Sequence, residues 1–271
     1  MDIAVCVPDS VLSERPSLLS KTEKVGEIIR AVSIFEVKTL MVYHDSEDGS
    51  LYDMKLFEIL VKYLLTPPYL RKFAFPMSNE LKYVGFLPPI NIPSHTVEKE
   101  DNFRHGIIIR TGNEIYVETG IGKRVRLTGY SNVKNGDIIP VKLVKTGSGV
   151  EAVRHNFKGY SGPDFVRVMN FLSFIDSINY DNNTVIYTSR EGDHASRVWK
   201  GLAHKIKTTN KVVLLFGSPK RGFEDMLDKS YRKKGFWVNV AEGQAVRTIR
   251  TEEAVLISLG LMNFVARITD F

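Results

Sequence analysis

The sequence has almost no cysteine and no long apolar run. Its 271 residues contain one cysteine, Cys6, so no disulfide can form within the chain, and a secreted disulfide-rich scaffold is excluded. The longest apolar runs, such as Val212 to Phe216, are far shorter than the ~20 residues of a membrane span. The first five residues contain an acid and no basic stretch, unlike a signal peptide. We therefore expect a soluble cytoplasmic protein that does not act at a membrane.

Several common catalytic motifs are also missing. The absence of GxxxxGK[ST] and GxGxxG argues against phosphate-loop NTPases and dinucleotide-binding Rossmann enzymes. The six histidines show no HExxH spacing, and only one cysteine could act with them as a metal ligand, so we expect no bound metal. No GxSxG elbow is present, and Cys6 lies in a predicted strand, where a buried thiol is inert. The net charge is +6, which suits a polyanion such as RNA but is also common in proteins without one.

The two ends of the chain, residues 1–76 and 159–271, alternate between short apolar runs and amphipathic segments. Val25, Ile28, Ile29 and Val32, for example, fall on one helical face. The pattern predicts strands at 3–7, 39–43, 184–188, 211–216 and 236–240, and helices around 25–32, 54–64, 163–178, 195–206, 223–233 and 251–268. Apolar strands separated by helices predict one α/β domain with a mostly parallel sheet.

The middle segment, residues 77–158, has a different pattern. It is rich in glycine turns, and between them lie short β-forming runs at 106–110, 114–118, 125–127 and 138–144. Closely spaced short strands predict a small antiparallel barrel inserted into the α/β domain. The segment has 12 Lys and Arg against 8 Asp and Glu, so it holds +4 of the net charge. A basic barrel is either a platform for an oligonucleotide or a solvated domain that positions the rest.

Three strands in the C-terminal half end in loops rich in glycine and polar residues. These loops cover residues 188–192, 216–222 and 242–253. In open α/β sheets, ligands bind beyond the carboxyl ends of the strands, so together the loops predict a binding site. Each loop also has a purely structural explanation. The glycines permit turns, and Glu252 and Glu253, after an N-cap at Thr251, complement a helix dipole. These patterns predict where a ligand binds, but they do not predict which reaction takes place there.

The same loops resemble those of the SPOUT class of RNA methyltransferases. RTIRTEEAVLISLGLMN (Arg247 to Asn263) resembles the last motif of that class, and FGSPKRGF (Phe216 to Phe223) resembles its glycine-rich second motif. Both are similar to motifs of the family that methylates N3 of a uridine in small-subunit ribosomal RNA. That family has an acid in the second loop, where this chain has Lys220 and Arg221.

The whole chain resembles one SPOUT subfamily, the archaeal and eukaryotic RNA methyltransferases with an inserted OB-like domain. The shared patches run nearly end to end. They are residues 3–8, PPYLRKFAFP (67–76), GFLPPINIPSH (85–95), FRHGIII (103–109), TSREG (188–192), the FGSPKRG loop and GQAVRTIRTEEAVLISL (243–259). The resemblance implies a trefoil-knotted α/β methyltransferase domain formed by residues 1–76 and 159–271, with residues 77–158 as an RNA-binding barrel. It also implies a homodimer with the active site near its interface.

The resemblance further implies that S-adenosylmethionine binds in the three loops. The expected cofactor-binding residues are Thr188, Ser189, Phe216, Gly217, Ser218, Gly222, Gln244, Thr248, Ile249 and Ala254. A uridine N3 must lose its proton during methylation, so a base and a stabiliser of negative charge are needed. The candidates for these catalytic roles are Arg190, Glu191, Arg250 and Glu252. The expected contacts to ribosomal or transfer RNA are Arg71, Lys72, Arg104, Lys123, Arg124 and Arg126.

Two other functions remain open at this stage. The chain lacks a clear aspartate base, and its second loop carries Lys220 and Arg221 in place of an acid. Both features also fit a non-catalytic RNA-binding factor for ribosome assembly that keeps the methyltransferase fold. A dimeric scaffold with no RNA role is the third reading, and the basic middle segment argues against it. Cofactor binding and turnover on RNA distinguish the three.

Overall fold

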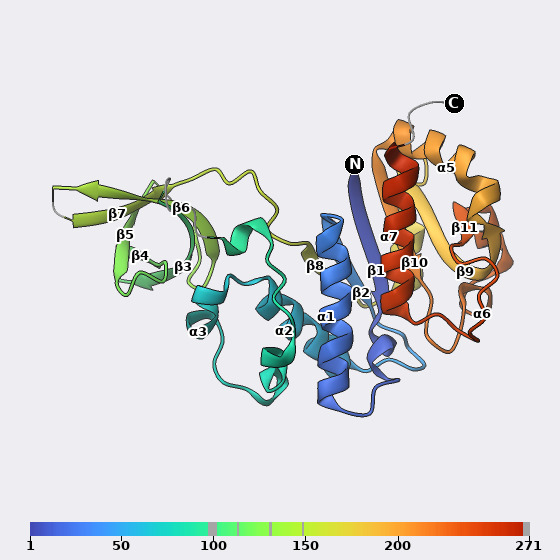
Figure 1. The fold of residues 1–271 in the computed structure, drawn as a ribbon, viewed down its shortest axis with the longest axis horizontal. Helices are drawn as coiled ribbons and strands as arrows, with labels where there is room; N and C mark the ends of the chain where they lie inside the picture. The colour runs from blue at the N-terminus through green and yellow to red at the C-terminus, as the bar shows by residue number, and fades with distance from the viewer. Residues whose placement is uncertain (97–101, 113, 130–131, 148, 268–271) are drawn as a thin grey trace. The chain divides into compact units, whose positions relative to one another are not determined.

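The computed structural model describes residues 1–96, 102–112, 114–129, 132–147 and 149–267. These residues form two compact units (Figure 1). The first unit contains Met1–Val61, Tyr83–Pro88 and the described residues from Gly162 onward. The second contains Lys62–Lys82 and the described part of Pro89–Ser161. Within the described residues, no helix is long and apolar enough to cross a lipid bilayer.

The first unit is built around a six-stranded sheet in which every neighbouring pair is parallel. The strand order is β11-β9-β10-β1-β2-β8. The strands are β1 (Asp2–Pro8), β2 (Thr39–Tyr43), β8 (Asp164–Val168), β9 (Thr184–His194), β10 (Lys211–Phe216) and β11 (Phe236–Asn239). The register places Ile3 opposite Val212 and Val5 opposite Leu40, so β1 lies in the middle of the sheet. The parallel α/β architecture predicted from the sequence is confirmed.

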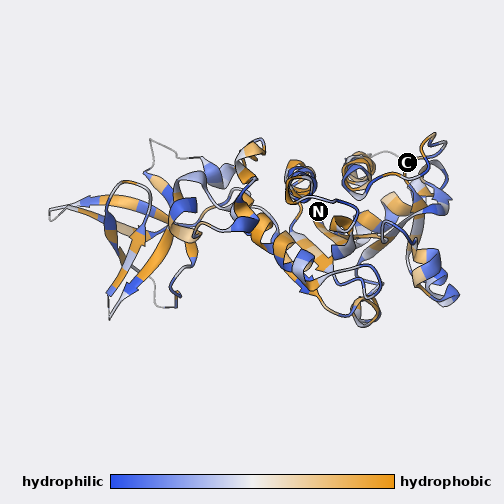
Figure 2. Ribbon diagram, turned by 90° about the horizontal axis from the view of Figure 1, so that it is seen from below, coloured by the Kyte–Doolittle hydropathy of each residue, from blue (hydrophilic) through white to orange (hydrophobic). Residues whose placement is uncertain are grey.

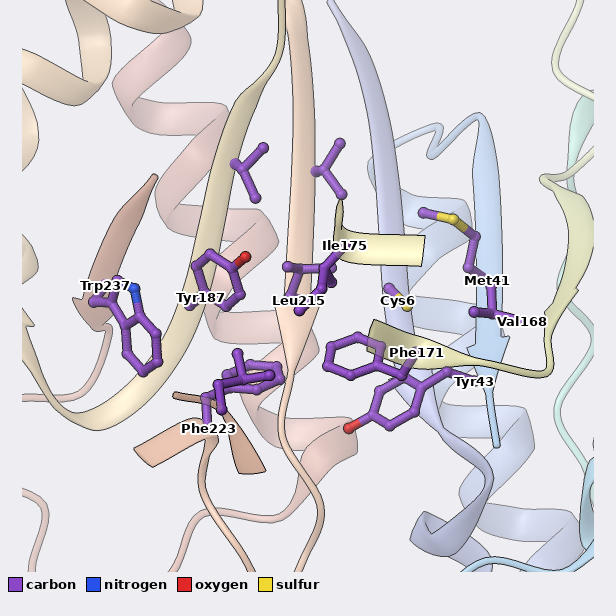
Figure 3. Packing of buried hydrophobic residues seen from close by; sticks show 13 residues of the cluster. Cys6, Met41, Tyr43, Val168, Phe171, Ile175, Tyr187, Leu215, Phe223 and Trp237 are labelled. Carbon is purple, nitrogen blue, oxygen red and sulfur yellow. The ribbon is translucent and has the colours of Figure 1, made fainter. Parts of the chain in front are cut away.

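Helices cover both faces of this sheet. Those of the first unit are α1 (Leu18–Ile34), α4 (Phe171–Ser177), α5 (Ala195–Thr209), α6 (Phe223–Met226) and α7 (Thr251–Arg267), and α2 (Leu51–Leu65) begins in it. α1 and α7 pack side by side on one face (Figure 1). α4 and α6 contribute to an aromatic cluster on the opposite face (Figure 3). This cluster fixes the beginning of α6, which matters for the site described below.

The aromatic cluster is tightly stacked. The rings of Tyr43 and Phe171 lie 4.1 Å apart, and Phe223 of α6 packs 5.8 Å from Phe171 and 5.3 Å from Tyr187. Offset-stacked and edge-to-face rings at these distances stabilise a core beyond the area that they bury. Cys6 is fully buried in the same cluster, and this burial raises the pKa of its thiol. The thiol is therefore protonated and unreactive at neutral pH, as the sequence predicted.

The prediction of a single helix at residues 163–178 is wrong. Its first part is the edge strand β8, which pairs with β2 and places Phe165 opposite Leu40. The helix α4 starts only after Asn170, whose side chain accepts a hydrogen bond of 2.9 Å from the Ser173 N–H. The apolar residues of this segment have helical spacing by coincidence, and strand pairing overrides it.

Two shorter predictions also need correction. Residues 188–192, expected in a loop, belong to the long strand β9. They lie opposite a register shift of β11, which pairs Trp237 with Tyr187 and the next residue, Val238, with Asp193. The helix predicted at 223–233 is divided into α6 and a 3-10 helix, Lys229–Lys233. Asp228 separates them, because its side chain accepts a hydrogen bond from the Ser230 N–H and starts a new turn there.

The second unit contains a closed five-stranded barrel with the order β3-β4-β5-β7-β6. The strands are β3 (Phe103–Thr111), β4 (Glu114–Glu118), β5 (Arg124–Thr128), β6 (Ile138–Thr146) and β7 (Gly149–Arg154), and the short helix α3 (Arg71–Ala74) belongs to the same unit. The barrel strands contain hydrophobic residues (Figure 2), and those that point inward form the buried core of the barrel. The predicted OB-like barrel is confirmed, although β7 was missed and its pairing with β5 is parallel.

Candidate active site

A pocket of the first unit lies where β10 and β11 end, beside the middle of β9. Its volume is about 350 Å³, within the range of small-molecule sites. All ten residues predicted to bind a cofactor line it: Thr188, Ser189, Phe216, Gly217, Ser218, Gly222, Gln244, Thr248, Ile249 and Ala254. Residues from three separate segments of the chain therefore meet in one cavity at the sheet edge where ligands of α/β proteins bind.

One wall is the tight loop between β10 and α6. A Cβ atom at Gly217 would lie 3.2 Å from the carbonyl oxygen of Arg221, so the loop folds back closely on itself. The Tyr43 hydroxyl donates a hydrogen bond of 3.0 Å to the carbonyl of Phe216 and holds the end of β10. Gly217 and Gly222 have no side chains, so backbone groups contribute to this wall and the loop can fold this tightly.

The opposite wall comes from β9. The Thr188 hydroxyl donates to the carbonyl of Leu215 at 2.9 Å, which ties β9 to β10. The Ser189 hydroxyl donates to the carboxylate of Glu224 and accepts a hydrogen bond of 2.9 Å from the Glu191 N–H. The Asn239 side chain donates to the Arg190 carbonyl at 2.9 Å. This wall is held by hydrogen bonds on both sides and is pre-organised before any ligand binds.

The third wall is the segment before α7. The Gln244 side chain donates to the Val246 carbonyl at 3.0 Å and shapes its own loop. The predicted N-cap at Thr251 is wrong by one residue: α7 begins at Thr251, and the backbone N–H of Arg250 donates to the Glu253 carboxylate at 2.9 Å. This half of a capping box fixes the helix start beside the pocket.

The structure brings two of the four predicted catalytic residues to the pocket. Arg190 and Glu191 line it, whereas Arg250 and Glu252 do not. Glu252 is buried and forms ion pairs with Arg15 at 2.9 Å and with Lys24 of α1 at 3.0 Å. Burial raises the pKa of Glu252, but its backbone hydrogen bond and the two cations outweigh this and hold the pKa below its usual value. These contacts tie α7 to α1 and leave Glu252 unsuited to accept a proton from a substrate.

Lys220 and Arg221 line the pocket, but acids from the segment after β2 hold their charged groups. Lys220 pairs with Asp48 at 2.6 Å, and Arg221 pairs with Asp45 at 2.8 Å and also with Glu47. Although burial raises the pKa of Asp45, its hydrogen bonds with side-chain hydroxyls and the charge of Arg221 lower the pKa overall. These ion pairs tie the glycine loop to the segment after β2. This wall of the pocket therefore forms without an acid at positions 220 and 221.

The pocket also contains acids that sequence reasoning missed. Glu224 and Asp225 of α6 line it. The Glu224 carboxylate contacts Ser189 and lies 3.3 Å from Arg232. The available signal was the position of Glu224, two residues after the second glycine of the loop. An acid in a first helical turn is equally well explained as a partner of the helix dipole, so its position alone does not identify it as a pocket residue.

The predicted RNA contacts fall into two groups. Lys72, Lys123, Arg124 and Arg126 are exposed on the second unit. Arg71 donates to the carbonyls of Thr66 at 3.0 Å and Leu64 at 3.2 Å, and Arg104 donates to the carbonyl of Thr119 at 3.3 Å. Arg71 and Arg104 therefore contribute to the internal structure of the unit. In the described part of the chain, no three His, Cys, Asp or Glu side chains are grouped so as to hold a metal ion.

Comparison with known proteins gives consistent matches along the chain. A family model described as "Putative RNA methyltransferase" matches residues 2–262. An uncharacterized protein of Haloarcula marismortui is 28% identical over 279 residues, which cover 96% of this chain and 98% of the relative. The human 28S rRNA (uridine-N(3))-methyltransferase is 28% identical over 300 residues, covering 96% of this chain and 77% of the relative. The Drosophila melanogaster protein of the same description is 25% identical over 314 residues, 96% of this chain and 61% of the relative.

Proposed function

This chain belongs to the RNA methyltransferase family whose model spans residues 2–262, and we propose that it transfers a methyl group from S-adenosylmethionine to N3 of a uridine in ribosomal RNA. The observation that carries the proposal is the pocket. All ten residues expected to bind the cofactor line a single cavity of about 350 Å³. The uridine target is supported by relatives from human, mouse and fly, each described as a 28S rRNA (uridine-N(3))-methyltransferase.

The residues present fit the methyl donor. The glycine loop around Gly217 and Gly222 presents backbone groups that recognise an adenine edge, and Ile249 adds apolar surface for the ring. Thr188 and Ser189 form a wall for the polar part of the molecule. When bound, S-adenosylmethionine supplies a methyl group on a positively charged sulfur and becomes a neutral thioether.

Arg190 and Glu191 are the proposed catalytic residues, and they occupy neighbouring positions on β9. The Glu191 side chain is 63% exposed, so its carboxylate can reach a bound base and accept the proton of N3. The Arg190 guanidinium contacts the carbonyl of Arg247 at 3.4 Å, and it can stabilise the negative charge that develops on the uridine oxygens. Arg250 and Glu252 have no role in this scheme, because they lie outside the pocket.

The direct test is methylation of ribosomal RNA that lacks the modification, with the purified protein and S-adenosylmethionine. The expected product is 3-methyluridine, identified by mass spectrometry of the digested RNA. Glu191→Gln is expected to lower the rate and to leave cofactor affinity unchanged. RNA that binds tightly but acquires no methyl group would instead identify the protein as a non-catalytic assembly factor.

We further propose that residues 77–158 form an RNA-binding domain and that residues 1–76 and 159–271 form the methyltransferase domain. The support is the exposed basic face of the barrel. Arg124 and Arg126 point outward from β5, and Arg126 lies opposite Tyr116 of β4. In OB-like barrels this pair of strands holds oligonucleotides, with aromatic rings available for stacking on bases.

Replacing both Arg124 and Arg126 by alanine is expected to weaken RNA binding about tenfold at 100 mM salt and to flatten its salt dependence by about two units of slope. Each arginine contributes a phosphate contact that releases a counterion. Filter binding at several salt concentrations provides the measurement. The control variant, Lys55→Ala with Lys211→Ala, removes the same charge from exposed positions of the other unit. Equal losses in the two variants would contradict a specific role of the barrel.

We also propose that the protein is a homodimer that pairs through α7. Leu256, Ile257 and Phe264 are 45%, 39% and 63% exposed on this helix, an apolar surface of the kind that marks interfaces. Light scattering of the wild type should give twice the mass of one chain. Leu256→Asp with Phe264→Asp should halve that mass, whereas Ile34→Asp, at an exposed apolar position at the end of α1, should not. A monomeric wild type would refute this proposal.

A further inference from the structure

Glu224 is a carboxylate that the pocket holds with one oxygen occupied and one oxygen open. Its side chain is 17% exposed. The first oxygen, Oε1, accepts hydrogen bonds from the Ser189 hydroxyl and from Arg232 at 3.3 Å. In the part of the chain that the structure describes, no hydrogen bond or ion pair reaches Oε2, and this atom is not buried.

The open oxygen lies against the glycine loop that lines the pocket. A Cβ atom added to Gly222 would lie 2.5 Å from Oε2, so the absence of a side chain at Gly222 leaves room for this oxygen. The carboxylate therefore extends over the backbone of the loop. A ligand held by that backbone would meet Oε2 directly.

Contacts with Arg232, which itself packs on Trp237, fix the position of Glu224. Arg232 lies 4.6 Å over the ring of Trp237 in β11 and also donates to the Glu191 carbonyl at 3.4 Å. Trp237 is buried in the aromatic cluster (Figure 3). The chain of contacts from Trp237 through Arg232 to Glu224 holds the carboxylate in one orientation, as a pre-organised binding group requires.

Other charged side chains also line the pocket, and Arg190 and Arg247 equal Glu191 and Asp225 in number and opposite charge. The cations of the glycine loop, Lys220 and Arg221, are held by Asp48 and Asp45 of another segment. Arg232 shares the charge of Glu224 but contacts Oε1 only. The pocket thus presents a fixed partial negative charge through Oε2, which favours a positively charged ligand over a neutral one of the same shape.

We propose that Glu224 is a ligand-binding residue that favours the positively charged methyl donor over the neutral thioether left after transfer. This inference rests on the proposed function, since it requires S-adenosylmethionine to bind in this pocket. S-adenosylmethionine and S-adenosylhomocysteine share the adenosine and amino-acid groups and differ in a methyl group and the charge on sulfur. The ratio of their affinities therefore isolates the contribution of charge. A charge-selective residue helps the product to leave and the next donor to bind.

Calorimetric titration of the full-length protein with each compound tests the proposal. Glu224→Gln keeps the shape of the side chain and removes its charge. It is expected to weaken binding of S-adenosylmethionine about fivefold more than binding of S-adenosylhomocysteine, a partly screened charge effect. Glu224→Asp, which keeps the charge, should retain most of the wild-type ratio. Thermal unfolding of each variant should match the wild type, which excludes a folding defect.

The matched control is Asp193→Asn, which removes the same charge from an exposed position of β9 outside the pocket. This variant should leave the affinity ratio unchanged. An unchanged ratio in Glu224→Gln, or an equal change in both variants, would overturn the inference while the cofactor site stands. A wild-type protein that binds neither compound would overturn the proposed cofactor site itself.

Discussion

Replacing Ile249 by aspartate is expected to abolish binding of S-adenosylmethionine, lowering the affinity about 100-fold or more. Ile249 lines the pocket and is partly buried there. A carboxylate at this position would lose its hydration when the adenosine group arrives, and it would gain no partner in return. An unpaired buried charge costs several kcal/mol, so the bound state would be lost at accessible concentrations. Calorimetric titration measures the effect directly.

The control for this variant comes from the same loop. Val246 is 60% exposed and does not line the pocket. Val246→Asp introduces the same charge three residues away and is expected to bind the cofactor with wild-type affinity. Normal binding by Ile249→Asp would mean that the methyl donor sits elsewhere. Loss of binding in both variants would point to a general disturbance of the loop before α7.

The largest expected effect on stability comes from Glu252→Ala. This change removes a buried partner from Lys24, whose side chain is completely inaccessible, and from Arg15. Removing one member of a buried ion pair typically costs about 3–5 kcal/mol, because the other charge stays buried and unpaired. Lys24 keeps its second partner, Glu14, at 2.9 Å, so we expect about 3 kcal/mol. For a protein of this size the melting temperature should fall by about 6–12 °C.

The control is an exposed ion pair of similar geometry. Lys234 pairs with Asp176 at 3.2 Å, and both side chains are about half exposed. Lys234→Ala should change stability by less than about 1 kcal/mol, as exposed pairs usually do. Urea denaturation measures both variants. If Glu252→Ala were as stable as the wild type but inactive on RNA, the structural role assigned to Glu252 would be refuted.

The same residue gives stability a defined pH dependence. The pKa of Glu252 is lower in the folded protein than its ordinary value. Its stabilising contribution is therefore complete above the ordinary pKa of glutamate, about 4.3, and is lost as the pH falls from there through the lower folded pKa. The difference in unfolding free energy between wild type and Glu252→Ala should shrink over this acidic range and stay constant between pH 6 and 8.

Much of the sheet and of the pocket could be predicted from the sequence. The strands at 39–43 and 211–216 have the bounds that the sequence predicts. An uninterrupted run of β-branched and aliphatic residues is typical of a strand that is buried on both faces of a parallel sheet. The pocket followed from the rule that loops at the carboxyl ends of parallel strands converge. Motif resemblance then indicated which loop residues face the cavity.

The failures have physical causes that a single sequence does not display. Segment 163–178 shows helical spacing, but the free edge of β2 pairs with its first part. Glu252 and Glu224 are both acids in the first turn of a helix, and sequence spacing cannot tell which one faces the pocket. The difference depends on distant partners, because Lys24 and Arg15 hold Glu252. Ser189 and Arg232 hold Glu224.

The place of β1 in the sheet has a consequence for how the protein folds. This first strand pairs on one side with β2, but its other neighbour is β10, so that Ile3 meets Val212. During synthesis β1 is made before β10, so one edge of this apolar strand stays unpaired until the later strand has left the ribosome. Closing so long a loop is slow for entropic reasons. The barrel strands, by contrast, are close together in the sequence and can pair early. The order of synthesis thus leaves the central strand of the sheet exposed longest, at the stage when newly made chains are most prone to aggregation.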